Sequence, residues 1–222
     1  MHPPNAPPAA SPPVFAEPTP LGLLGLAIGC AALVPIAFNL VPADPAKAAM
    51  MLKTAAWFCL LFGAGGQFLA GVMCLANKNM LGGTLFTTFS FNWVYNWWVL
   101  DTLSFGKVPD ATVGVCVDVA FLVIFAVLTY AFGFFSKLLF AFLLDIDLLY
   151  LFRIGRHFAE PGGGAWGPLS VGIGAATLGL IALALYIAFA LLVNPAAGRP
   201  VFPMPGPMFV PSSQPAAPPP AA

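Results

Sequence analysis

Six long runs of apolar residues divide the chain, and short polar joints separate most of them. Each run is close to the ~20 residues that an α-helix needs to span the hydrocarbon core of a bilayer. Strands of a membrane barrel would be shorter, about 10 residues, and would alternate apolar with polar positions, which these runs do not. We therefore predict an all-α membrane protein, a bundle of six transmembrane helices over residues 21–41, 48–76, 82–100, 111–135, 137–154 and 168–193.

The two ends of the chain break this pattern, because both are crowded with Pro and Ala. Proline removes a backbone donor and blocks helix formation, so we expect disordered tails at residues 1–20 and 195–222. The six-helix transmembrane domain then covers residues 21–194.

Composition agrees with a protein whose solvent is lipid. Hydrophobic residues make up 60% of the chain and charged residues only 7%, whereas soluble domains carry about 25% charged residues. The net charge is zero, which gives no reason to expect a nucleic-acid partner. The cysteines and the two histidines form no close cluster, so we expect no metal and no cofactor. A multi-pass protein of the cell membrane, plasma or inner, is the expected class.

Small residues recur where the predicted helices would touch. In lipid the hydrophobic drive between helices is lost, and close backbone approach at glycine becomes a main source of attraction. We expect such contacts at Gly22, Gly25, Gly29, Gly63, Gly66, Gly71, Gly172, Gly174 and Gly179.

Polar residues form a stripe along the third run. Thr84, Thr88, Asn92 and Asn96 follow one another at intervals of four, with Thr87 beside them. Residues four apart share one helix face, with a slow drift around the axis. The hydroxyls could bond back to their own helix or to a neighbouring one, or the stripe could line a polar pathway. Gln67 in the second run has the same two interpretations, interhelical contact or ligand-facing donor.

Asp145 and Asp147 lie in the middle of the fifth run. An acidic group at that depth costs about 2.5–3.5 kcal/mol on insertion scales, so intramembrane acids are usually functional. Two residues apart on a helix, they point about 200° from one another. The sequence is consistent with two roles for these acids, proton transfer and a structural ion pair. The pair fits no enzyme: an Asp-x-Asp metal site needs a polar loop, and an intramembrane aspartyl protease needs its acids on separate helices.

Aromatic residues crowd the end of the third run, where Trp93, Tyr95, Trp97 and Trp98 are interpreted as an interfacial belt. Deeper phenylalanines, including Phe89, could form a steric gate.

The chain resembles the acetate uptake transporter family at sparse positions. The first helix opens with Pro18, Pro20, Leu21, Gly22 and Leu23, and Gly198, Arg199, Val201 and Pro203 match the family's closing motif. The most specific block runs from Phe62 and Gly63 through Gln67, Asn79, Gly82, Thr84, Thr87 and Thr88 to Trp93.

This resemblance implies a six-helix protomer in a homo-hexamer, with a pore for small carboxylates in each protomer and proton-linked uptake. The narrowest part of the pore would fall on Leu26, Phe89 and Asp145. The chain departs from the family at Asp145, where the family has Leu. An ionised carboxylate there would repel an anionic solute by several kcal/mol at an effective ε of 20.

Our hypothesis is therefore a membrane transporter or channel for small monocarboxylates or dicarboxylates. Asp145 and Asp147 would be the proton-coupling residues. The substrate path would be lined by Gln67, Thr84, Thr87, Thr88 and Asn92. The alternatives are a pore for another small solute, and a non-transporting scaffold or sensor of the same fold.

Overall fold

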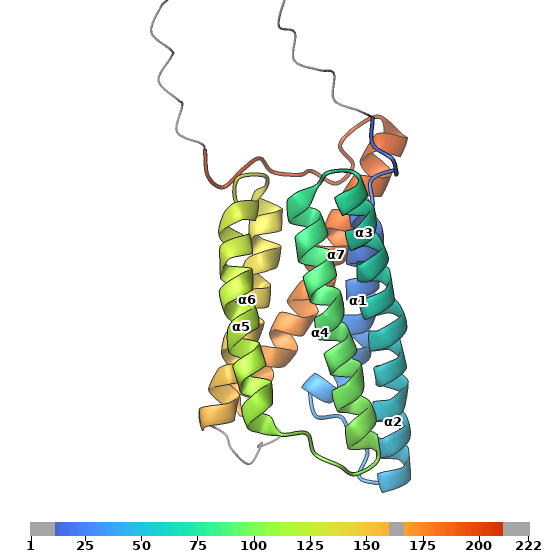
Figure 1. Ribbon diagram of the computed structural model, residues 1–222, viewed down its shortest axis with the longest axis vertical. Helices are drawn as coiled ribbons and strands as arrows, with labels where there is room; N and C mark the ends of the chain where they lie inside the picture. The colour runs from blue at the N-terminus through green and yellow to red at the C-terminus, as the bar shows by residue number, and fades with distance from the viewer. Residues whose placement is uncertain (1–11, 160–166, 211–222) are drawn as a thin grey trace, which may run out of the picture.

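The computed structural model describes residues 12–159 and 167–210, and all regular structure in these ranges is helical (Figure 1). The elements are α1 Thr19–Ala37, α2 Pro45–Phe58, the π-helix η1 Cys59–Gly66, α3 Gln67–Ala76, α4 Met80–Ser104, α5 Ala111–Phe132, α6 Lys137–Ala159 and α7 Pro168–Ala197. Because α2, η1 and α3 follow one another without a break, the described elements form six helical rods. Each rod covers one of the six predicted runs.

The rods differ in how well they suit a bilayer. Four are long and apolar enough to cross a membrane: α1, the 32-residue rod Pro45–Ala76, α5 and α7. The other two are also long, 25 residues in α4 and 23 in α6. They carry more polar side chains, such as Asn92 and Asn96 in α4 and Asp145, Asp147 and Arg153 in α6. Hydropathy therefore supports four spans directly.

Side-chain caps set where three of the rods begin. The Asp44 carboxylate accepts hydrogen bonds from the backbone N–H groups of Ala46 and Lys47 at the start of α2. Asn79 caps α4 through Gly82, and Asp110 caps α5 through Val113. Each cap satisfies an N–H group that the first turn of a helix leaves unpaired.

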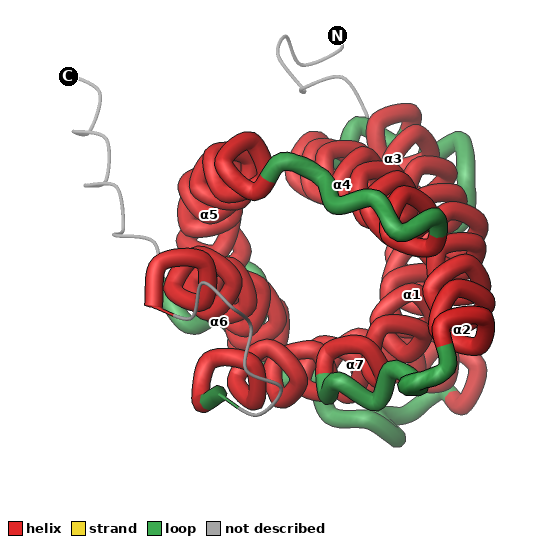
Figure 2. The backbone as a smooth tube through the Cα atoms, turned by 90° about the horizontal axis from the view of Figure 1, so that it is seen from below, coloured by secondary structure: helices red, strands yellow, loops and turns green. Residues whose placement is uncertain are grey.

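Helices α1, α4, α5, α6 and α7 surround a common axis, and the rod α2–η1–α3 lies outside them (Figure 2). Around the axis α1 packs on α7, α7 on α6, and α6 on α5. The rod α2–η1–α3 lies outside the ring, against α1 and α4 (Figure 2). Between α4 and α5 the helices meet through side chains, because the aromatic rings of Phe89 and Phe125 have their centroids 4.9 Å apart. The sequence alone does not predict which rod is excluded from the ring.

Glycines allow the outer rod to approach the ring. A Cβ placed on Gly25 in α1 would lie 2.5 Å from the Phe62 carbonyl oxygen, and one on Gly66 would lie 3.2 Å from the Cα of Gly25. Only a residue without a side chain fits at such a distance from a backbone. The predicted close contacts at Gly25 and Gly66 are confirmed.

Glycines of α1 and η1 make room for one large side chain. A Cβ on Gly63 would lie 2.5 Å from the Trp93 ring, and one on Gly29 would lie 3.0 Å from it. Trp93 is therefore inserted between α1 and η1 and is only 2% exposed. The prediction that Trp93 belongs to an interfacial aromatic belt is wrong, because its ring fills the space that these two glycines leave.

Both ends of the chain are more ordered than proline content predicts. Helix α7 continues to Ala197 and ends at Gly198, whose φ of 62° is left-handed. The segment 199–210 then folds back: Asn194 accepts from the N–H groups of Val201 and Phe202, and the Phe209 N–H donates to Gly133. At the other end, Asn77 exchanges two hydrogen bonds with the Phe15 backbone. The expectation of disordered tails is thus wrong for residues 12–20 and 195–210, and the remaining tail residues lie outside the described ranges.

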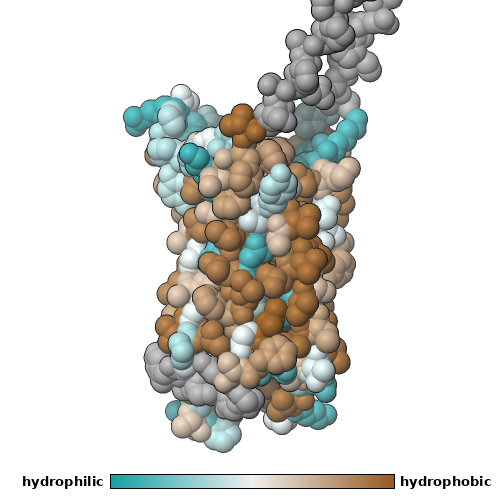
Figure 3. Space-filling view, turned by 90° about the vertical axis from the view of Figure 1, so that its left-hand side faces the viewer, coloured by the Kyte–Doolittle hydropathy of each residue, from teal (hydrophilic) through white to brown (hydrophobic). Residues whose placement is uncertain are grey.

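The outer surface seen from the α5–α6 side is mostly hydrophobic (Figure 3). Exposed apolar side chains there include Val119, Val123, Val127, Leu148 and Leu151. Such a surface is stable against lipid rather than water.

Candidate functional site

Two cavities occupy opposite ends of the ring. The upper cavity lies at the end of the bundle where α1 and α4 begin, which is the top of the ribbon in Figure 1. It has a volume of about 200 Å³, and Leu23, Phe86, Phe142, Ile187 and Met204 are among its lining residues. The lower cavity has a volume of about 260 Å³, and Cys30, Phe89, Leu149 and Leu180 are among its lining residues. The same four helices, α1, α4, α6 and α7, contribute to both. The cavities therefore face each other along the axis of the ring.

A layer of apolar side chains separates the cavities. Each of the four shared helices has a buried apolar residue at or between the positions that line the two ends. These residues, which we call the apolar layer, are Leu26, Phe89, Ile146 and Ala184, each at most 3% exposed. Leu26 and Phe89 are two of the three residues expected at a constriction. Hydrophobic constrictions of this kind can gate a pore by excluding water.

Asp145, the third residue expected at the constriction, is one position away from the layer. Its Oδ2 would lie 2.7 Å from a Cβ on Gly179, so the carboxylate packs against α7. That oxygen is buried and has no hydrogen-bond partner among the described residues. The lining of the two cavities contains Leu149 and Phe142 of α6 but not Asp145. Asp145 thus lies beside the axis, at the α6–α7 interface.

Asp147 faces the other way, as the helical spacing predicts. Its Oδ2 accepts a hydrogen bond of 2.7 Å from the Thr129 hydroxyl of α5, and the residue is 7% exposed. The Asp147 carboxylate is therefore hydrogen-bonded to α5, whereas the Asp145 Oδ2 lies against α7 without a partner among the described residues.

The predicted polar stripe of α4 does not stay on one face. Each step of four residues advances about 40° around a helix, so the stripe turns by about 120° over three steps. Thr84 is exposed on the outside of the bundle and Thr88 is half-buried. Asn92 and Asn96 line the lower cavity. Only the end of the stripe reaches the axis.

Gln67 of α3 and Thr87 of α4 lie away from the two axial cavities. Gln67 is 1% exposed, and its Oε1 has no partner among the described side chains and backbone. Thr87 packs on α3, where its Oγ1 would lie 2.4 Å from a Cβ on Gly71. Neither residue lines the upper or lower cavity, so the structure separates them from Asn92.

Charged and aromatic residues that the sequence interpretation left out surround the lower cavity. Tyr150, Arg153 and Arg156 of α6 line it, as does Trp93. A side cavity of about 480 Å³ between α4, α5 and α6 shares Arg153 and Arg156 and adds Asp118. Tyr150, Arg153 and Arg156 follow at intervals of three residues, so each is the neighbour of the next on the surface of α6.

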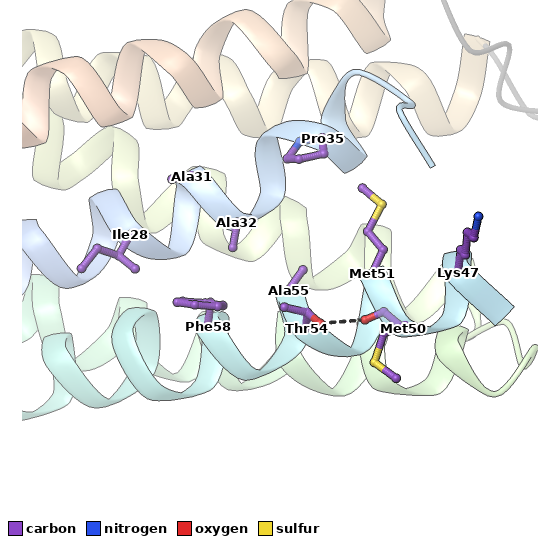
Figure 4. Close-up of a pocket in the computed structure, with 10 residues that line it drawn as sticks. All are labelled: Ile28, Ala31, Ala32, Pro35, Lys47, Met50, Met51, Thr54, Ala55 and Phe58. Carbon is purple, nitrogen blue, oxygen red and sulfur yellow. Dashed lines mark hydrogen bonds between the residues drawn. The ribbon is translucent and has the colours of Figure 1, made fainter. Parts of the chain in front are cut away.

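A further cavity is a groove between α1 and α2, with a volume of about 550 Å³ (Figure 4). Apolar side chains such as Ile28, Phe58, Met50 and Met51 line it. Its one hydroxyl, on Thr54, already donates to the Met50 carbonyl at 2.8 Å (Figure 4). The only other polar side chain among its described lining residues is Lys47. Because this groove lies outside the ring of helices, between α1 and α2, the two axial cavities form the candidate site.

Comparison with solved structures identifies a protein with this arrangement of helices. The structure of the bacterial acetate channel SatP superposes with a TM-score of 0.73, over 86% of this chain and 99% of that one, at 20% sequence identity. No protein-family model matches the sequence, and no protein of curated function does. The resemblance expected from sparse motifs is confirmed for the fold: this chain is similar in fold to the bacterial acetate channel SatP.

Proposed function

We propose that this protein is a multi-pass membrane channel or transporter for small carboxylates, with all six rods crossing the bilayer. The observation that carries the proposal is the pair of facing cavities separated by the apolar layer. This pair of cavities lies in a fold that the chain shares with an acetate channel.

The proposed path runs from one cavity to the other through the apolar layer. Leu26 and Phe89 exclude water while the path is closed, and movement of the Phe89 ring opens it. Asn92 supplies hydrogen bonds on the lower side. Neutral donors replace the hydration of a carboxylate while keeping its binding weak enough for release. Gln67 and Thr87 support the α4 wall from the side of the outer rod. Thr88 is half-buried, and Thr84, which is exposed, has no part in the path.

Asp145 is the proposed proton carrier. Its carboxylate is buried without a partner beside the apolar layer, where an ionised acid repels an anion about 5 Å away by about 3 kcal/mol at an effective ε of 20. The anion passes more easily when Asp145 is protonated, which links its movement to protons. Asp147 is held by Thr129 and takes a secondary role.

The proposal includes a homo-oligomer in the plasma or inner membrane. Apolar side chains on the outer rod, such as Trp57, Leu61, Phe68 and Leu69, are exposed in the single chain. They are available to lipid or to further copies of the chain. Cross-linking in native membranes, resolved by mass, distinguishes a hexamer from a smaller assembly.

Uptake of labelled acetate into proteoliposomes tests the function directly. We expect uptake above that of protein-free vesicles, faster with an inward proton gradient, and competition by unlabelled propionate. Absence of acetate and succinate flux in both gradient directions, from protein that is folded and inserted, contradicts the proposal. Flux of acetamide but not acetate would identify a pore for neutral solutes, and no flux of any kind would favour the scaffold or sensor.

A further inference from the structure

Three polar groups around the lower cavity are buried without hydrogen bonds. They are Trp93 Nε1, the Tyr150 hydroxyl and Asn92 Oδ1, none of which has a partner in the described part of the chain. The three residues are 2%, 1% and 3% exposed, and all line the lower cavity. A buried polar group left unpaired costs about 1–3 kcal/mol, and native proteins contain few of them. An acceptor that enters the cavity would pair with Trp93 Nε1–H and the Tyr150 hydroxyl, which can donate, whereas Asn92 Oδ1 is itself an acceptor and pairs only with a donor.

Packing fixes two of these groups in orientation. A Cβ on Gly63 would lie closest to Cδ2 and Cγ of Trp93 and one on Gly29 closest to Cη2 and Cζ3, so the indole is held between two helices at both of its rings. The Tyr150 ring stacks on Phe121 and Phe125 at centroid distances of 5.7 Å each. The Arg153 guanidinium lies 5.5 Å from the Tyr150 ring centroid. Neither aromatic ring can therefore turn away from the cavity without disturbing its neighbours.

The chemistry of the groups identifies the kind of ligand. Trp Nε1–H is a donor only, a Tyr hydroxyl donates or accepts, and an Asn side chain carries both an NH₂ and an oxygen. Arg153 and Arg156 line the same cavity, and no Asp or Glu of the described chain does. The Trp93 indole, the Tyr150 hydroxyl and the Asn92 NH₂ group can donate, and two guanidinium groups line the same cavity, although Arg153 is paired with Asp118. This set favours an anion with oxygen acceptors. The volume of about 260 Å³ is just below the ~300–1,000 Å³ of pockets for drug-sized molecules, so the ligand is small.

We propose that Asn92, Trp93 and Tyr150 form a binding site for the carboxylate of a small organic acid, with Arg153 and Arg156 attracting it from the mouth of the lower cavity. Phe89 of the apolar layer would contact the hydrocarbon part of the acid. The inference rests on the proposed function and specifies it: this site would load the solute on one side of the closed layer.

Thermal unfolding of the purified full-length protein in detergent tests the site without requiring transport. Sodium acetate and sodium butyrate are titrated at constant ionic strength against sodium chloride, and Kd is obtained from the rise in Tm. Tyr150→Phe and Trp93→Phe each remove a donor but keep a ring. We expect each to weaken butyrate binding about tenfold, the usual loss for a hydrogen bond to a charged group. Acetamide, which is neutral, should stabilise the protein less than acetate.

Matched variants separate the site from general effects on folding. Tyr130→Phe removes an exposed hydroxyl and Trp57→Phe an exposed indole, and both should bind butyrate as the unmodified protein does. Unchanged butyrate affinity in Tyr150→Phe and Trp93→Phe, or equal binding of acetamide and acetate, overturns the inference. If a variant unfolds without ligand, one-dimensional ligand-observed NMR of butyrate with Asn92→Ala supplies the same comparison.

The two proposals fail in distinguishable ways. Butyrate binding that depends on Tyr150, with no flux in proteoliposomes, supports the site and contradicts transport. Acetate flux that Tyr150→Phe leaves unchanged supports transport and contradicts the site.

Discussion

The guanidinium of Arg153 lies 3.0 Å from the Asp118 carboxylate, and this ion pair joins α6 to α5. The Asp118 side chain is 9% exposed and the Arg153 side chain 26%. The pair stands where the lower cavity meets the side cavity, since Arg153 lines both and Asp118 only the second. Asp118 therefore holds one of the two arginines in place while lowering its effective charge.

Replacing Asp118 with Asn should destabilise the protein, because it leaves Arg153 partly buried without a counter-charge. Breaking a fully buried pair costs about 3–5 kcal/mol, and we expect about 1–3 kcal/mol here, given the exposure of Arg153. Thermal unfolding measures the change. The double variant Asp118→Asn with Arg153→Gln should lose less than the sum of the single variants, and strict additivity would show that the ion pair contributes nothing.

Gly25→Ala should be poorly tolerated, because its Cβ would meet the Phe62 carbonyl oxygen at 2.5 Å. A backbone atom cannot move away as a side chain can, so α1 and η1 must separate. Overpacking of this kind costs about 1–3 kcal/mol. The matched control is Gly65→Ala, whose nearest atom is 3.7 Å away. Equal Tm values for the two variants would contradict the packing of α1 on η1.

Asp145→Asn should flatten the pH dependence of acetate uptake. In the unmodified protein Asp145 is neutral only when protonated, so uptake should rise as pH falls from about 7 to about 5. An amide is neutral at both values. Asp147→Asn is the control, since its amide oxygen can still accept the bond from Thr129. A pH profile that survives in Asp145→Asn but is lost in Asp147→Asn would assign the proton role to Asp147 and contradict the proposal for Asp145.

Phe89→Leu should widen the apolar layer and raise the basal flux of acetate several-fold, while reducing discrimination against longer acids. Phe→Ala changes in cores lower the free energy of unfolding by about 3–5 kcal/mol. Leucine fills more of the space than alanine, so the loss of stability is smaller. Phe91→Leu is the control, because Phe91 is 59% exposed on the same helix. Flux measured in proteoliposomes should respond to the first substitution and not to the second.

The helices could be predicted because apolar run length and proline placement are local properties. The six predicted runs correspond to the six rods, and Gly25 and Gly66 mark a helix contact that does form. The tail was mispredicted because proline content says nothing about tertiary partners. Asn194 supplies side-chain bonds that hold residues 201 and 202 against the bundle.

The candidate site was only partly predictable, because helix rotation decides which face meets the axis. Leu26, Phe89 and Asn92 were identified, and they lie in the layer or the lower cavity. Thr84 belongs to the same stripe as Asn92, but the drift of successive turns carries it to the outside. Tyr150 was missed because its importance depends on α5, whose Phe121 and Phe125 stack against it.

The two mouths of the proposed path are chemically unlike. At the upper end the chain's own returning segment contributes Met204 to the cavity wall, whereas at the lower end Arg153 and Arg156 stand at the opening. Anions approaching from below meet a favourable potential, and those from above meet a covered, mainly apolar entrance. We expect conduction to rectify: anion current through oriented protein in a planar bilayer should be larger in one direction than in the other at equal and opposite voltages.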